Sequence, residues 1–201
     1  MSASRRETER LLLRRPAERD LEAVWGMNAR PEIAWGTRGP GELPYSREES
    51  DRFLRGRMAG WDEFGFDLWC CFLKDTGDFV GLAGIVVPTF LPPVMPAVEV
   101  GWRLHPDHWG RGLATEAARE GLRLGFGELE LERVISIIRP DNERSIRVAE
   151  RLGLRHDYDL DHPRGFVVAI YAIEAQAWRT ANPATISEST DVSASTAANP
   201  S

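Results

Sequence analysis

Apolar and polar positions divide the chain into short strand-like runs and longer segments of helical spacing. Runs of apolar and β-branched residues bounded by Gly, Pro and Asp favour strands. They lie at residues 10–15, 68–74, 79–87, 98–104, 133–138 and 166–173. The Asp-Thr-Gly-Asp turn at 75–78 predicts that the second and third of these strands form a hairpin.

Four segments predict helices. One begins at Pro16 and runs to about residue 27, because proline fits the first turn of a helix. A second spans 46–58, where Ser46 and Glu49 form a capping-box signature. The spacing of small and apolar residues predicts a third at 113–125, and a fourth covers 142–152 and ends at Gly153.

The order of these elements predicts the fold class. Hairpins come early and strand–helix–strand units come late, which favours an α/β (α+β) fold with a central mixed sheet covered by helices on both faces. We expect residues 1–8 to be a loose leader and 9–180 a single domain. Residues 181–201 are rich in Ser, Thr, Ala and Pro, and we expect them to be a disordered tail.

Composition and charge narrow the range of functions. A net charge of −6 argues against nonspecific nucleic-acid binding, and no apolar segment has membrane-spanning length. The polar start shows no signal peptide, so we expect a cytoplasmic protein. The two cysteines, Cys70 and Cys71, are adjacent. In a strand they point to opposite faces, and we expect both to be reduced.

The stretch HWGRGLATEA, residues 108–117, is the clearest chemical signal. Gly110 and Gly112 flank Arg111 directly before a helical run. Glycine permits a sharp turn and a close approach of the backbone, and free amides at a helix start attract anions. The stretch therefore predicts a phosphate-binding loop. An ordinary strand-to-helix turn with a solvated arginine is the alternative.

Three blocks resemble the Gcn5-related N-acetyltransferases, the GNAT superfamily. Residues 99–117, EVGWRLHPDHWGRGLATEA, resemble its acetyl-coenzyme A signature, and residues 142–154, NERSIRVAERLGL, resemble its second conserved block. The opening TERLLLRRPAERD, residues 8–20, resembles the ribosomal-protein-alanine acetyltransferase (RimJ/RimL-like) branch. The resemblance covers residues 8–178. It implies a twisted, mostly antiparallel sheet and acetyl transfer from acetyl-coenzyme A to a primary amine.

The resemblance also implies which residues bind the coenzyme. The family's pyrophosphate loop maps onto residues 109–114, with Trp109 in place of the usual polar first residue. Asn142 would contact the pantetheine arm, and it also suits an N-cap, so that both roles can hold at once. The implied coenzyme-binding residues are Trp102, Arg103, Leu104, Trp109, Gly110, Arg111, Gly112, Leu113, Ala114, Thr115, Asn142 and Arg147.

For the chemistry, the resemblance implies direct attack of the amine on the thioester. The resemblance implies that Glu99 is the general base, and Glu99 lies in a strand whose other residues suggest burial. The alternative is that the Glu99 side chain faces solvent and has no catalytic role. Many relatives carry a tyrosine as general acid, but Ala149 occupies that position here. Ser145 is the nearest alternative hydroxyl, and packing within the helix is the alternative for Ser145.

The acceptor side is less specified. Five aromatic residues lie in or near the early helices, and they either line an acceptor groove or belong to the core. They are Trp25, Trp35, Tyr45, Trp61 and Phe64. The proline-rich segment 87–98 covers the groove, meets another subunit of a homodimer, or simply packs as a loop. The acidic segment 156–162, HDYDLDH, reads as a solvated strand end, an acidic wall for a cationic amine, or a metal site.

Taken together, these patterns predict an acetyl-coenzyme A-dependent N-acetyltransferase. Its acceptor is a small-molecule amine or a protein N-terminus, and we expect no metal, nucleic-acid or membrane partner. Two competing hypotheses remain: a coenzyme A-binding protein without catalysis, and an acyltransferase for another acyl donor.

Overall fold

The computed structural model describes residues 3–39 and 41–183 of the 201-residue chain. The strands are Arg5–Glu7 (β1), Leu11–Arg14 (β2), Trp69–Leu73 (β3), Phe79–Val86 (β4), Glu99–Leu104 (β5), Arg133–Ile138 (β6), Arg155–His162 (β7) and Phe166–Glu174 (β8). The helices are Leu21–Asn28 (α1), Pro31–Thr37 (α2), Arg47–Phe64 (α3), Leu113–Arg123 (α4), Glu143–Arg151 (α5) and Ala175–Ala181 (α6). All six predicted strands and all four predicted helices are present, and β1, β7, α2 and α6 are additional.

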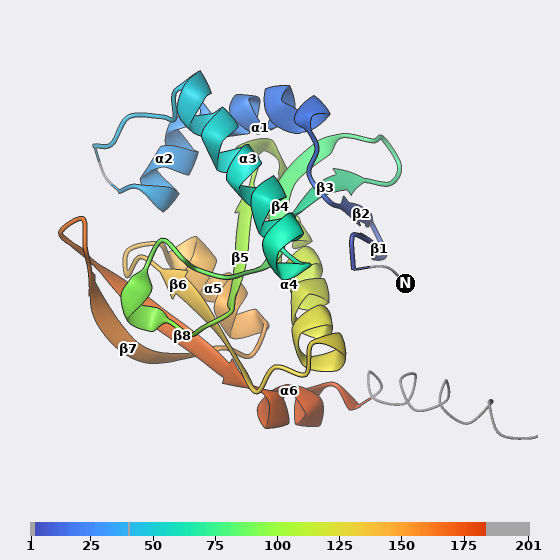
Figure 1. The fold of residues 1–201 in the computed structure, drawn as a ribbon, viewed down its shortest axis with the longest axis vertical. Helices are drawn as coiled ribbons and strands as arrows, with labels where there is room; N and C mark the ends of the chain where they lie inside the picture. The colour runs from blue at the N-terminus through green and yellow to red at the C-terminus, as the bar shows by residue number, and fades with distance from the viewer. Residues whose placement is uncertain (1–2, 40, 184–201) are drawn as a thin grey trace, which may run out of the picture.

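Eight strands form one sheet in the order β1-β2-β3-β4-β5-β6-β8-β7 (Figure 1). Neighbouring strands run antiparallel, except that β5 and β6 are parallel. The connection between those two strands contains α4, as a parallel crossover requires. The predicted mixed, mostly antiparallel sheet is confirmed.

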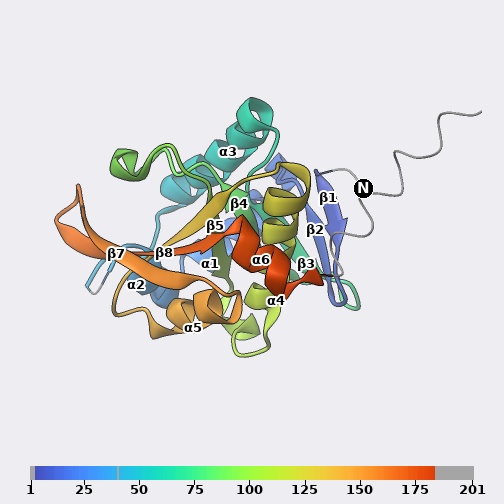
Figure 2. The ribbon, with the colours of Figure 1, turned by 90° about the horizontal axis from the view of Figure 1, so that it is seen from below.

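Helices cover both faces of the sheet, with α3 on one side and α5 on the other in Figure 2. Val24 of α1 and Leu54 of α3 pack with Cys70 on one face. Cys71 belongs to a second buried cluster on the opposite face, which includes residues of α4 and α5. The predicted separation of the two cysteines is thus confirmed. Both are free, and burial raises the pKa of both thiols, so neither is an activated nucleophile.

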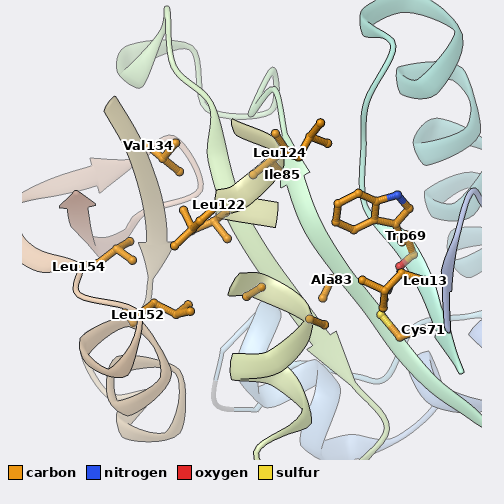
Figure 3. Packing of buried hydrophobic residues seen from close by; sticks show 14 of the residues in the cluster. Leu13, Trp69, Cys71, Ala83, Ile85, Leu122, Leu124, Val134, Leu152 and Leu154 are labelled. Carbon is orange, nitrogen blue, oxygen red and sulfur yellow. Dashed lines mark hydrogen bonds between the residues drawn. The ribbon is translucent and has the colours of Figure 1, made fainter. Parts of the chain in front are cut away.

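The larger buried cluster fixes α4 against the sheet. Leu122 of α4 packs with Ile85 of β4 and with Leu152 at the end of α5 (Figure 3). Gly121 allows a close approach, because a Cβ at that position would lie 3.0 Å from the carbonyl carbon of Gly84. The start of α4 is therefore held in a set position relative to β4 and β5.

The N-cap of α3 follows its sequence signature. The Ser46 hydroxyl accepts from the Glu49 amide, and the Glu49 carboxylate accepts from the Ser46 amide. The helix continues past the predicted end at residue 58 because Trp61 is buried against Trp69. Gly65, with φ of 76°, ends it in the left-handed conformation that glycine adopts readily.

The expectation of a loose leader at residues 1–8 is wrong for its described part. Arg5–Glu7 pair with β2, and the Arg6 guanidinium is buried at 3.4 Å from the Glu120 carboxylate of α4. This charged strand carries no apolar signal, so only its distant partner reveals it. The predicted tail lies outside the described residues from residue 184 onward. Within the described ranges, no helix is long and apolar enough to cross a membrane.

Candidate active site

The two parallel strands β5 and β6 part directly after Glu99. They are in register at one position, where Glu99 lies opposite Ile135, whereas β4 stays paired with β5 over the length of β5. Beyond Glu99, no described strand pairs with the β5 edge that faces β6. An unpaired strand edge of this kind can bind a ligand that carries amide groups, such as the pantetheine arm of coenzyme A.

The loop between β5 and α4 has the conformation of a phosphate cradle. Gly110 and Gly112 have φ values of 73° and 77°, which side chains rarely adopt. Among the described residues, the six amides from Gly110 to Thr115 have no hydrogen-bond acceptor, and Glu116 is the first to donate back, to the Gly112 carbonyl at 3.1 Å. The Thr115 hydroxyl is buried without a partner in the same part of the chain. Free amides and an orphaned hydroxyl fit a pyrophosphate.

Thr8 and Arg10, from the N-terminal region, bind the start of α4 and the loop before it, and we call these two residues the clasp. Arg10 donates from its amide and its Nε to the Glu116 carboxylate, at 2.8 and 2.7 Å, and from Nη1 to the Arg111 carbonyl at 2.9 Å. Thr8 adds a 2.5 Å hydrogen bond to Glu116. The clasp neutralises a carboxylate in the first turn of α4, where a negative charge would repel an incoming phosphate. No local sequence pattern indicated this role of Arg10.

Trp109, which replaces the family's polar first residue, anchors the loop to β5. Its indole Nε1 donates to the Leu104 carbonyl at 2.8 Å, and its ring packs against the buried clusters on both faces. The Arg144 guanidinium of α5 lies 4.7 Å from the centre of the Trp109 ring. Trp109 and Arg144 thus join the two blocks that resemble the coenzyme site. The Arg111 side chain is exposed and contacts His108 at 3.0 Å.

The N-terminus of α5 is capped by Asn142, whose Oδ1 accepts from the Ser145 amide at 3.2 Å. The N-cap role of Asn142 is confirmed, and its contact with the coenzyme stays a prediction. The Ser145 side chain is half-buried, while Ala149 is fully buried in the core and offers no hydroxyl. Arg147 is exposed and pairs with Glu143 at 3.2 Å, so its side chain is already engaged on the helix surface.

Glu99 is buried, with 8% of its surface exposed, so the solvent-facing alternative is wrong. Its Oε1 accepts from the Ile137 amide of β6 at 3.3 Å, which places the carboxylate where the two strands part. Burial raises the pKa of Glu99 to about 7, opposed by the Ile137 hydrogen bond and the positive charge of Arg57. A carboxylate with this pKa can accept a proton near neutral pH.

Side chains along β5 alternate between the two faces, which separates two of the predicted coenzyme-binding residues. Trp102 packs against the cluster beneath α4. Arg103 turns to the other face, where it donates to Asn28 Oδ1 at 3.0 Å and to the Tyr45 hydroxyl at 3.4 Å. The Arg103 side chain therefore belongs to the α1–α3 side together with Glu99. Because the Arg103 side chain lies on that face, only its backbone can make the predicted contact with the coenzyme.

The proline-rich segment 87–98 packs on the same face of the sheet as Glu99. Leu91 is fully buried against Ile135 of β6 and Ile170 of β8. This segment covers the β6–β8 half of the face, while α1 and α3 cover the β3–β4 half. Glu99 therefore lies at the boundary between the two covers. The segment packs as a loop against the sheet, while its predicted cover of the acceptor groove and its contact with another subunit stay predictions.

The acidic segment 156–162 forms most of the edge strand β7. Asp157 pairs with Arg133 at 2.5 Å and Asp159 with His156 at 2.8 Å, and all four side chains are exposed. A bulge between His156 and Tyr158 shifts the register of β7 on β8. Across the described part of the chain, no three His, Cys, Asp or Glu side chains gather into a possible metal site.

Comparisons with known proteins show the family of this chain. A model of the acetyltransferase (GNAT) domain matches residues 10–155. YkkB, an uncharacterized protein of Bacillus subtilis (strain 168), is 30% identical over 154 residues, which are 74% of this chain and 84% of YkkB. YoaA, an uncharacterized N-acetyltransferase of the same strain, is 28% identical over 75% of this chain and 82% of its own length.

Solved structures share the fold. An acetyltransferase from Agrobacterium tumefaciens is 30% identical with a TM-score of 0.72, over 85% of this chain and 94% of that chain. The RimL ribosomal alpha-N-protein acetyltransferase in complex with coenzyme A is 18% identical with a TM-score of 0.65, over 85% of this chain and 97% of that one. This second likeness shows the fold alone. The chain belongs to the GNAT acetyltransferase family, and it is an acetyltransferase that uses acetyl-coenzyme A to acetylate amines.

Proposed function

We propose that the acetyl donor and the amine acceptor meet at the point where β5 and β6 part. The free amides of Gly110 to Thr115 bind the pyrophosphate, and the unpaired edge of β5 binds the pantetheine arm. The amine approaches from the opposite face, at Glu99. The observation that carries this proposal is the position of one buried carboxylate, held by Ile137, where the two strands separate.

Glu99 takes one proton from the amine as the nitrogen attacks the thioester carbonyl. A C–N bond forms, the C–S bond breaks, and the leaving thiolate takes up a proton. The half-buried Ser145 hydroxyl near the start of α5 is the nearest candidate donor, since Ala149 replaces the usual tyrosine. Substrate binding next to a base with a matched pKa removes much of the cost of bringing the groups together.

The narrower RimJ/RimL-like assignment would make a protein N-terminus the acceptor. It rests on the opening block at residues 8–20 and on a likeness in fold alone. A peptide with a free N-terminal alanine or serine is therefore one of the acceptors to test.

The test is release of free thiol from acetyl-coenzyme A with a panel of peptides and small amines. We expect turnover with at least one amine and an N-acetylated product by mass spectrometry. Coenzyme A binding without turnover of any amine would instead support a binding protein without catalysis. Faster turnover with a propionyl or succinyl thioester would support another acyl donor.

A further inference from the structure

The acceptor face carries two half-buried cations that the proposed acetyl transfer does not use. Arg57 of α3 and Arg103 of β5 lie on the same side of the sheet as Glu99, and both stack on one ring. Their guanidinium carbons are 5.7 and 4.1 Å from the centre of the Phe53 ring. The two guanidinium groups therefore form one cationic cluster close to the base.

Arg103 has no carboxylate partner among the described residues. Its two hydrogen bonds go to neutral acceptors, Asn28 Oδ1 at 3.0 Å and the Tyr45 hydroxyl at 3.4 Å. Burial lowers the pKa of Arg103, and the charges of Arg57 and Arg38 lower it further. A guanidinium has five donors, and burying it without an anion is costly. The remaining donors of Arg103 suit an anion that comes with a ligand.

Arg57 is only partly neutralised. Its contact with Asp67 is long, at 3.4 Å, and its Nε is buried without a hydrogen-bond partner. Burial raises the pKa of Asp67 to about 6, which weakens Asp67 as a counterion. By contrast, the nearby Arg38 has a close partner in Glu49 at 2.6 Å. The surplus positive charge therefore lies on Arg57 and Arg103 rather than on every arginine of this face.

Between the base and the cations, β5 carries no side chain on this face, because the intervening residue is Gly101. Gly101 lies on β5 between Glu99 and Arg103, and alternation places all three on one face. A Cβ at Gly101 would meet no atom closer than 3.8 Å, the Cδ2 of Leu68. Glu99 and Arg103 are four residues apart on β5, about 13 Å between their Cα atoms. The Glu99 carboxyl carbon lies 4.0 Å from the Cβ position of Gly101, so the Glu99 side chain leans toward the guanidinium groups and shortens the distance that a small molecule must span.

Resting on the proposed function, we infer that the acceptor is an amine that also carries a carboxylate. The amine lies at Glu99, and the carboxylate binds the guanidinium groups of Arg57 and Arg103. Guanidinium groups bind carboxylates with paired, charge-assisted hydrogen bonds. A polyamine would instead place a second cation beside these arginines, which disfavours it. This class of substrate also supplies the counterion that Arg103 lacks.

The experiment compares three acceptors of similar length: 4-aminobutyrate, butylamine and 1,4-diaminobutane. We expect kcat/KM to be at least about tenfold higher for 4-aminobutyrate than for butylamine, and lowest for the diamine. Arg57→Gln and Arg103→Gln should each lower kcat/KM for 4-aminobutyrate by about 10–100-fold through KM, and should lower kcat/KM for butylamine several-fold less than that, so that the preference for the carboxylate is lost. Arg103→Lys keeps the charge and should retain the preference.

Arg55→Gln is the matched control, because Arg55 also lies on α3 but is exposed and pairs with Glu18. Preference for the diamine, or an equal loss for all acceptors in the two Gln variants, would overturn the inference. Calorimetry of 4-aminobutyrate with the protein saturated in coenzyme A gives a readout independent of turnover. Binding that Arg57→Gln abolishes, without acetylation of any amine, would contradict the proposed function and still support this carboxylate site.

Discussion

The donor side and the acceptor side of this site are built from different materials. On the donor side, the binding groups are backbone amides of one continuous loop, and side chains such as Arg10 and Trp109 only hold that loop in place. On the acceptor side, the binding groups are buried side chains from α1, α3 and β5. A backbone cradle suits a coenzyme common to a whole family. Buried side chains can change from one member to another and select the acceptor.

The two sides also differ in whether their charged side chains have counterions. On the donor side, Glu116 near the cradle is neutralised by Arg10 at 2.6 Å. On the acceptor side, Glu99 accepts an amide hydrogen bond but forms no ion pair within 4 Å among the described residues, and Arg103 lacks an anion too. The Glu116 carboxylate on the donor side is thus paired before the coenzyme arrives, whereas Glu99 and Arg103 on the acceptor side have no counterion in the described part of the chain. Variants on each side should therefore fail in different ways.

The largest expected effect comes from Glu99→Gln. The amide keeps the shape and can still accept from the Ile137 amide, but it cannot take a proton. Loss of a general base should lower kcat by about 10²–10⁴-fold. Stopped-flow or steady-state thiol release measures this change. A weakly basic amine, which arrives neutral, should be affected less. Equal activity of the variant and the parent on both kinds of amine would exclude Glu99 as the base.

The same substitution should change stability with pH. The folded state raises the pKa of Glu99 from 4.5 to about 7, so the folded state binds the proton more tightly than the unfolded chain. The contribution of Glu99 to stability is therefore present below about pH 4.5 and is lost as the pH rises through 7. Glu99→Gln should be more stable than the parent at pH 8 by up to about 3 kcal/mol, with little difference at pH 4.

Urea unfolding of the parent and of Glu99→Gln at pH 4, 6 and 8 measures this difference. A gap that stays constant with pH would show that Glu99 has an ordinary pKa. The acceptor side would then be less desolvated than its burial indicates.

On the donor side, Gly112→Val should weaken coenzyme binding. Gly112 has φ of 77°, and a β-branched residue in this conformation costs about 1–2 kcal/mol, which corresponds to roughly tenfold in affinity. Thermal shift with increasing coenzyme A measures the loss. Gly77→Val is the matched control, because Gly77 has the same φ of 77° but lies in the β3–β4 turn. Equal coenzyme affinity of the two variants would contradict the cradle.

A smaller effect is expected from Arg10→Gln. Without Arg10, the Glu116 carboxylate stays charged in the first turn of α4 and opposes the pyrophosphate. A charge at a helix N-terminus is worth about 0.3–1 kcal/mol, so coenzyme affinity should fall by about two- to fivefold. Glu116→Gln added to Arg10→Gln should restore most of it. If the double variant binds no better than Arg10→Gln, repulsion by Glu116 is not the reason.

The sequence predicted the parts of this protein that depend on local chemistry. The glycine loop, the Ser46 cap and the burial of Glu99 each follow from neighbouring residues, and each is observed. The β1 strand pairs with the neighbouring β2, but it was missed because its three residues, Arg5 to Glu7, are all charged and give no strand pattern. The contacts of Arg6 with Glu120 and of Arg10 with Glu116 were missed because these partners lie more than one hundred residues away along the chain.

The acceptor cluster was missed for a related reason. Arg103 belongs to the stretch that resembles the coenzyme signature. Its position in the sequence does not show on which face of the sheet its side chain lies. That assignment requires the register of β5 on β4, where Arg103 lies opposite Leu82. Phe53 and Arg57 read as ordinary helix residues until α3 is placed over the strand. Long-range packing, rather than local preference, determines this half of the site.

The most direct test of the division between the two sides is a full steady-state analysis of thiol release by the parent, Glu99→Gln and Gly112→Val with one common amine. We predict that Glu99→Gln lowers kcat by at least about 10²-fold with the KM for acetyl-coenzyme A nearly unchanged. Gly112→Val should raise that KM by about tenfold and retain most of kcat at saturation. If both variants change the same parameter, the donor and acceptor roles are not separated as the geometry indicates, and the account is contradicted.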